Sequence, residues 1–93
     1  MAQIYLPTPL RRLTRGQARV AAGGQTVEEA LVDLERRYPG LREQLHEPTG
    51  EVRRFINVFV NGTEIRMLQG PATPIGESDE VSIVPAMAGG TGS

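Results

Sequence analysis

Hydrophobic residues in the middle of the chain recur with the spacing of one face of an α-helix. They follow one another at intervals of three or four residues, while charged residues occupy the opposite face. Thr26 precedes this stretch and Glu29 has the spacing of a capping-box partner, so the pattern predicts a helix that begins at Thr26. The predicted apolar face comprises Val27, Ala30, Leu31, Leu34 and Tyr38.

The helical pattern ends at Pro39-Gly40. Beyond it, the segment 41–45 is short and has a leucine at each end. We expect it to form a helical turn that places Leu41 and Leu45 in the core.

Alternating and β-branched stretches predict five strands. The strongest is 55–60, which leads into Asn61-Gly62, a pair typical of two-residue hairpin turns. The return strand is predicted over 63–66. The other predicted strands are 3–6 and 19–22, which form an N-terminal hairpin with a long arginine-rich loop, and 80–84 at the end. One helix on one face of a mixed sheet of four to five strands is an α+β arrangement.

The same alternation indicates which side chains face away from the helix. We expect Tyr5, Phe59 and Val84 to form an apolar patch on that face, and Pro85 and Met87 to extend it. Such a patch suggests a surface that binds a partner protein. The alternative is that the connection 67–76 folds over the three side chains.

The composition excludes several classes of chemistry. The chain has 93 residues, which fits one domain, and it contains no Cys. A disulfide, a thiolate nucleophile and a thiolate zinc site are therefore impossible. All ten basic residues are Arg, so a Walker lysine and a Schiff base are also excluded. We expect a carrier or binding module rather than an enzyme, with no cofactor and no metal of its own.

Charge is unevenly distributed along the chain. Residues 1–27 carry four Arg and no acid, giving +4, and the remaining residues carry six Arg and eleven acids, giving −5, which sums to the net charge of −1. A basic segment can bind phosphate, but without a basic total or stacking aromatic residues a solvated loop is favoured over a nucleic-acid interface. The four arginines are Arg11, Arg12, Arg15 and Arg19.

Other candidate groups give little support for catalysis. His46 follows the predicted turn beside Glu47, and because a metal site needs three or four ligands we expect it to be solvent-exposed without a role. The carboxylates at 28–29 and 79–80 are adjacent in the sequence rather than opposed, so acid–base catalysis is not predicted. No apolar run is long enough to cross a bilayer and no signal segment begins the chain, so we expect a cytoplasmic protein without membrane contact.

The C-terminal residues are of a different kind. Gly89 and Gly90 follow the last predicted strand and Pro85. A backbone without side chains can enter a narrow channel of another protein, although such a sequence is also typical of a flexible linker. We expect residues 1–86 to form the folded domain and 87–93 to form a mobile tail.

Three segments together resemble the ubiquitin-like β-grasp sulfur carriers, the family of MoaD, ThiS and CysO proteins. They are the helix start at 26–31, the strand at 55–61, and the ending at 77–90 with its acidic turn, hydrophobic strand, proline and Ala-Gly-Gly. The resemblance covers nearly the whole chain from Ile4 to Gly90 and implies a β-grasp fold. The chain length and the block 54–61 are most similar to the carriers of cysteine biosynthesis.

The resemblance implies chemistry on the backbone rather than on a side chain. In this family an E1-like adenylating enzyme uses ATP to activate the terminal glycine carboxylate, which sulfur then converts to a thiocarboxylate. The reactive residue here would be Gly90, with Gly89 keeping the approach open. The implied recipient is a PLP-dependent cysteine synthase, or the molybdopterin synthase large subunit if the pathway is that of molybdopterin.

The sequence departs from the family pattern after Gly90. Thr91-Gly92-Ser93 follow, so the carbonyl of Gly90 is part of an amide. Some members of the family are trimmed by a JAMM-type zinc metalloprotease, which implies cleavage between Gly90 and Thr91; the alternatives are a remnant of cloning and an inactive homologue. A ubiquitin-like protein modifier and a small RNA-binding or interaction domain using the arginines also remain open. We expect a monomer when the chain has no partner.

Overall fold

The computed structural model describes residues 1–85 as one sheet covered by helices. None of the helices in this part of the chain is long and apolar enough to cross a membrane. The strands are β1 (Ala2–Tyr5), β2 (Arg19–Ala22), β3 (Ile56–Val60), β4 (Thr63–Glu64) and β5 (Glu80–Pro85). The α-helices are α1 (Thr8–Arg11), α2 (Val27–Arg37) and α3 (Arg42–Leu45), and the 3₁₀ turns are η1 (Arg12–Thr14), η2 (Pro39–Leu41), η3 (Ile65–Met67) and η4 (Gly70–Ala72).

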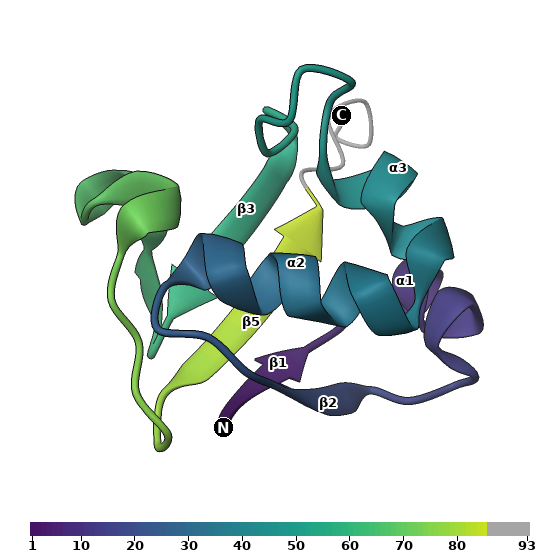
Figure 1. Ribbon diagram of the computed structural model, residues 1–93, viewed down its shortest axis with the longest axis horizontal. Coiled ribbons are helices and arrows are strands. Elements are labelled where there is room, and N and C mark those ends of the chain that lie inside the picture. Colours follow the sequence, from purple (N-terminus) through teal and green to yellow (C-terminus); the bar gives the residue numbers. More distant parts are fainter. Residues whose placement is uncertain (86–93) are drawn as a thin grey trace.

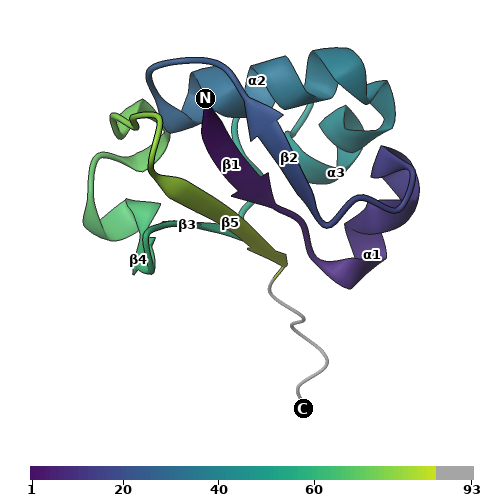
Figure 2. The ribbon, with the colours of Figure 1, turned by 90° about the horizontal axis from the view of Figure 1, so that it is seen from below.

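The sheet has the strand order β2-β1-β5-β3-β4 (Figure 1). The first strand β1 runs parallel to β5 and antiparallel to β2, and β3 runs antiparallel to both β5 and β4. The main helix α2 covers one face of this mixed sheet, and no helix within residues 1–85 covers the other face (Figure 2). The α+β class and the five-stranded mixed sheet with one main helix are thereby confirmed.

The start of α2 follows the predicted capping pattern with one difference. The Thr26 hydroxyl accepts a hydrogen bond from the Glu29 N–H at 3.2 Å. The Glu29 carboxylate reaches back to the N–H of Gln25 at 2.8 Å, one residue before the cap. Gly24 makes this approach possible, because its φ is +125° and a Cβ there would lie 2.7 Å from the Glu29 Cβ.

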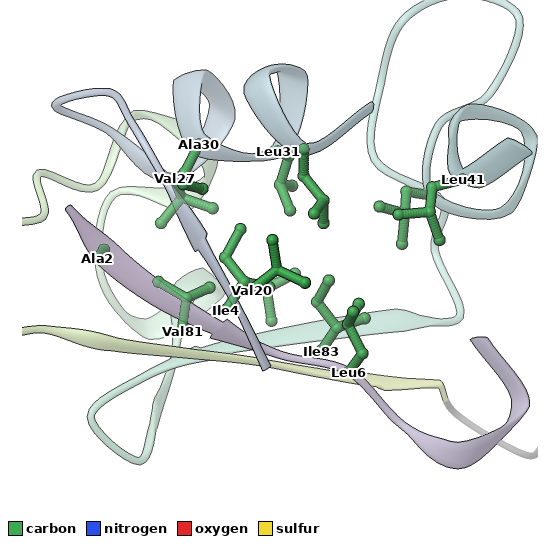
Figure 3. Packing of buried hydrophobic residues seen from close by; sticks show 14 of the residues in the cluster. Ala2, Ile4, Leu6, Val20, Val27, Ala30, Leu31, Leu41, Val81 and Ile83 are labelled. Atoms are coloured by element: carbon green, nitrogen blue, oxygen red, sulfur yellow. The ribbon is translucent and has the colours of Figure 1, made fainter. Parts of the chain in front are cut away.

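The core lies between α2 and the sheet (Figure 3). The α2 residues of the predicted apolar face, Tyr38 apart, are fully buried, and they pack over inward-facing residues of the central strands. Leu41 and Leu45 are also fully buried, which confirms the predicted helical turn. The inward-facing strand residues are Ile4, Val20, Ile56, Val58, Val60, Val81 and Ile83.

Two connections differ from the predictions. The return strand is shorter than 63–66, because the chain turns at Ile65 into η3 and buries that side chain. The loop between β1 and β2 forms α1 and η1, where Leu10 and Thr14 are buried. Both are short local structures without a periodic pattern, so hydrophobic periodicity does not predict them.

Candidate functional site

The face of the sheet opposite α2 carries a row of side chains at matching register. Tyr5 on β1 and Phe59 on β3 both pair with Ser82 on β5. The row continues to Arg19 on β2, which pairs with Tyr5, and to Glu64 on β4, which pairs with Phe59. Because paired residues of a sheet project to the same side, these five side chains share the uncovered face.

The apolar members of this face are partly open to solvent. Val84 lies two residues beyond Ser82 and is 44% exposed, while Tyr5 and Phe59 are half-buried. We call Tyr5, Phe59 and Val84 the sheet-face patch. Pro85, which we expected to extend it, pairs with the buried Ile56 and therefore projects to the side of α2 at the end of β5. Met87, the other residue of the predicted partner surface, lies outside the described residues.

The connection 67–76 does not cover this patch. The N–H of Val27 bonds the carbonyl of Thr73 at 3.0 Å, and the N–H of Ile75 bonds the carbonyl of Gln25 at 3.0 Å. The connection therefore packs beside the start of α2, on the other side of the sheet (Figure 1). The interpretation in which it folds over Tyr5, Phe59 and Val84 is wrong.

Phe55 is a further exposed aromatic residue that the sequence analysis did not include in the patch. It directly precedes β3 and is 49% exposed, and the Arg53 guanidinium lies 5.9 Å from its ring centroid. The adjacent residue Ile56 pairs with Pro85, so Phe55 is close to the end of β5. Phe55 and Phe59 are separated by an even number of positions, so strand alternation could have placed Phe55 on the same face as Phe59.

Arg19 contacts Tyr5 at the β2 edge of the patch. Its guanidinium lies 5.7 Å from the Tyr5 ring centroid and donates a hydrogen bond to the Tyr5 hydroxyl at 3.3 Å. This hydrogen bond is the main cause that raises the pKa of Arg19 above its ordinary value. The patch thus has a permanent positive charge at this edge.

His46 is not the exposed residue that we expected. Its side chain is buried, and its two ring nitrogens face two carboxylates of α2. Nε2 lies 3.2 Å from Glu28 Oε1, and Nδ1 is bonded to Glu35 Oε2. Burial raises the pKa of Glu35, and the charge of His46 opposes this effect. In residues 1–85 no group of three or more His, Asp or Glu side chains is arranged to hold a metal ion.

His46 also changes the interpretation of the α2 carboxylates, which the sequence analysis considered only as neighbours in the sequence. Glu28 and Glu35 are seven residues apart on α2 and therefore lie on the same helix face. The turn α3 delivers His46 between them. This cluster ties α2 to the segment after α3, where His46 also forms a β-bridge with Val52. It is a structural cluster on the helix side, separate from the sheet-face patch.

The remaining predicted site residues follow β5 in the sequence. Gly89, Gly90 and Thr91 lie outside the described residues, as Met87 does. The described chain ends with Val84 and Pro85 of β5. Phe55 and Phe59 lie near this end of the strand.

Comparisons with known proteins give consistent matches over nearly the whole chain. The model of the ThiS family matches residues 4–90. The chain is 43% identical over 89 residues to "Sulfur carrier protein CysO" of Mycobacterium tuberculosis, which covers 94% of this chain and 96% of the relative. It is 45% identical over 65 residues to "Small archaeal modifier protein 3" of Haloferax volcanii, 70% of each chain. A chain in the crystal structure of the Amycolatopsis orientalis BexX/CysO complex superposes with a TM-score of 0.88 at 36% identity, covering 96% of this chain and 99% of that one.

Proposed function

The chain belongs to the ThiS family of ubiquitin-like sulfur carriers, and from this premise we propose that Gly90 is the residue that carries the sulfur. The observation that supports Gly90 most directly is that the family match extends through residue 90 and so includes Gly89-Gly90. The chain is a carrier of the CysO type, and its own side chains need not supply a catalyst. The lack of Cys fits this role, because the sulfur would be bound to a backbone carboxyl group.

The proposed activation has two steps. A carboxylate oxygen of Gly90 attacks the α-phosphate of ATP in an E1-like adenylating enzyme, and pyrophosphate leaves. The sulfur of hydrosulfide, supplied by a sulfur donor, then attacks the carbonyl carbon of the acyl adenylate. AMP leaves, and a thiocarboxylate remains on Gly90. Gly89 and Gly90 have no side chains that would obstruct this approach. Because this chemistry consumes ATP, the location that we propose for the carrier is the cytoplasm.

Activation requires a free carboxylate on Gly90, whereas the sequence continues to Ser93. We therefore propose that a JAMM-type zinc metalloprotease hydrolyses the bond between Gly90 and Thr91. Water supplies the hydroxyl group to Gly90 and the proton to the new amino terminus at Thr91. Incubation of the full chain with the cognate protease should reduce its mass by the summed residue masses of Thr, Gly and Ser, and an unchanged mass would reject this maturation step.

The sheet-face patch supports docking to a partner enzyme beside the tail. Gly90 is five residues beyond Pro85, and five extended residues span at most about 18 Å. An enzyme that holds Gly90 in its active site must therefore approach the end of β5. The patch and the exposed Phe55 lie at or near that end, and the similar BexX/CysO structure is itself a complex of two proteins. Residues 1–86 act as the recognised domain and 87–93 as the delivered tail in this proposal.

The expected recipient of the sulfur is a PLP-dependent cysteine synthase. The similarity to proteins named CysO supports this choice over the molybdopterin synthase large subunit. The two recipients can be compared by adding each to the purified thiocarboxylate and following loss of sulfur from the carrier. Faster loss to the molybdopterin enzyme would assign the other pathway.

A mass measurement tests the central proposal. The form ending at Gly90 is incubated with the E1-like enzyme, ATP and a sulfur donor, and its intact mass is determined. We expect the mass change of one oxygen replaced by sulfur, which is absent without ATP. The matched control is a form ending at Gly89, in which the reactive carboxylate is displaced by one residue and conversion should be strongly reduced. No conversion of the Gly90 form would contradict the proposal.

The similarity to a protein named a small archaeal modifier favours one second function. Gly90 would then be joined by an isopeptide bond to a lysine of a target protein. The chain has no Lys, so chains of the protein cannot form on its own lysines. Proteomic detection of lysines bearing the C-terminal peptide of this chain would support conjugation. If extracts that contain the thiocarboxylate lack such lysines, only the carrier function is supported.

A further inference from the structure

We propose that the arginine loop, residues 7–18 between β1 and β2 together with Arg19 at the start of β2, docks against an acidic patch on the protein that accepts the tail. The inference rests on the proposed function, because it concerns the adenylating enzyme that would hold Gly90. The docking surface would then include charged residues of the loop as well as the apolar sheet-face patch, and the matching surface of the partner would be acidic.

The topology places the start of the arginine loop at the edge of the sheet where β5 ends. Strands β1 and β5 are adjacent and parallel, with Tyr5 opposite Ser82. Parallel neighbours end at the same edge of a sheet, so the loop that follows β1 and the residues that follow β5 start from the same end. Figure 2 shows α1 of this loop close to the end of β5. A protein that approaches the tail therefore meets the loop as well.

The exposed loop arginines Arg12 and Arg15 carry positive charge without a carboxylate partner among the described residues. No acidic residue occurs in residues 1–27. Within the described part of the chain, the side-chain ion pairs involve Arg37, His46, Arg53 and Arg66, and none of them uses an arginine of the loop. Arg19 is also exposed, but Glu80 on β5 lies close enough to act on its charge. The positive charge of Arg12 and Arg15 suits a partner surface of opposite charge.

The backbone of the loop is fixed, so the arginines are presented from a rigid base. Thr14 is fully buried, and its hydroxyl group donates to the carbonyl of Arg11 at 3.1 Å or of Gln17 at 2.9 Å. The N–H of Gly16 bonds the same Arg11 carbonyl at 2.7 Å. Leu10 anchors the loop in the core. Docking to a preformed loop costs less conformational entropy than ordering a mobile one.

An acidic protein surface fits the loop better than RNA does. Outside residues 1–27 the chain carries a charge of −5, which repels a polyanion that extends beyond the loop. Tyr5 lies under the Arg19 guanidinium, so one face of its ring is not open to a base. An acidic patch on a protein is local, and it can pair with the loop while apolar residues contact the sheet face.

Charge reversal with a matched control tests the inference. Arg12→Glu and Arg15→Glu, combined in the full chain and in the form ending at Gly90, change exposed side chains with no described hydrogen bond. Arg36→Glu combined with Arg42→Glu makes the same change in net charge at exposed positions outside the loop and away from the end of β5. Association rate constants with the E1-like enzyme are measured by stopped-flow at low and at high salt. Circular dichroism melting checks that all variants fold.

We expect the loop variant to associate at least about tenfold more slowly than the unmodified chain at low salt, with the difference shrinking at high salt. The control variant should stay within about threefold. The inference would be overturned if both variants associated equally slowly, or if neither associated more slowly than the unmodified chain. Thiocarboxylate formation by the unmodified chain would still support the proposed function in that case. Failure of the unmodified chain to form thiocarboxylate would instead reject the function. Tighter binding to a single-stranded RNA than to the enzyme, lost in the loop variant, would assign the loop to nucleic acid.

Discussion

Glu35 should make the stability of the protein depend on pH. Burial raises its pKa above the ordinary value of 4.5, so the folded chain binds this proton more tightly than the unfolded chain does. The associated stabilisation is complete below pH 4.5 and is lost as the pH rises through the raised pKa. In urea unfolding across this range, the free energy of unfolding of the protein minus that of Glu35→Gln should fall with increasing pH. A constant difference would show that Glu35 is not perturbed.

Asp79 provides a control of opposite sign. Hydrogen bonds from the Asn61 side chain and the Gly76 N–H lower its pKa below 3.8. Its contribution is therefore present above pH 3.8 and is lost as the pH falls through the lowered pKa. The difference in unfolding free energy between the protein and Asp79→Asn should shrink on acidification, whereas the difference for Glu35→Gln should grow.

Residues whose roles depend on a partner far along the chain could not be assigned from the sequence. His46 lies eleven residues after Glu35 and eighteen after Glu28. Its ring contacts both carboxylates only because the chain reverses direction through α3 and returns to α2. The sequence pattern around His46 is that of a loop and contains no sign of this return. Tyr5, Phe59 and Val84 were easier, since strand alternation alone indicates the face to which each belongs.

The helix α2 should depend measurably on its first residue. Thr26→Ala removes the hydroxyl that accepts the Glu29 N–H, and we expect a loss of about 0.5–2 kcal/mol in the free energy of unfolding. Thr26→Ser keeps the acceptor and should retain most of the stability. The comparison is made by urea denaturation, and equal stability of the alanine and serine variants would mean that the cap contributes little.

Elements with a strong local pattern were predictable, and elements set by tertiary packing were not. The helix α2 has both a periodic apolar face and a cap, and the turn Asn61-Gly62 adopts positive φ at both residues as a two-residue hairpin requires. The helix α1 has four residues, too few to show a period. The early end of β4 reflects burial of Ile65, which is a tertiary effect.

At the scale of the whole molecule, the pairing of the first strand with the last was beyond local patterns. The parallel contact between β1 and β5 joins residues that are more than seventy positions apart, and no local pattern in the sequence indicates it. The same contact places the arginine loop, the sheet-face patch and the end of β5 together. Topology thus brings the proposed recognition surfaces to the end of β5, five residues before the proposed reactive glycine in the sequence.

The two faces of the sheet should separate stability from partner binding, and β5 allows a test with adjacent residues. Ile83 is 2% exposed and faces α2, whereas Val84 is 44% exposed on the sheet-face patch. Ile83→Ala should cost about 2–5 kcal/mol of unfolding free energy because it leaves a cavity. Val84→Ala should change stability by less than about 0.5 kcal/mol. The same Val84→Ala chain should bind the E1-like enzyme more weakly, as measured by calorimetry. Unchanged affinity would show that the partner does not use this face, because a stable, folded variant leaves no other cause for the result.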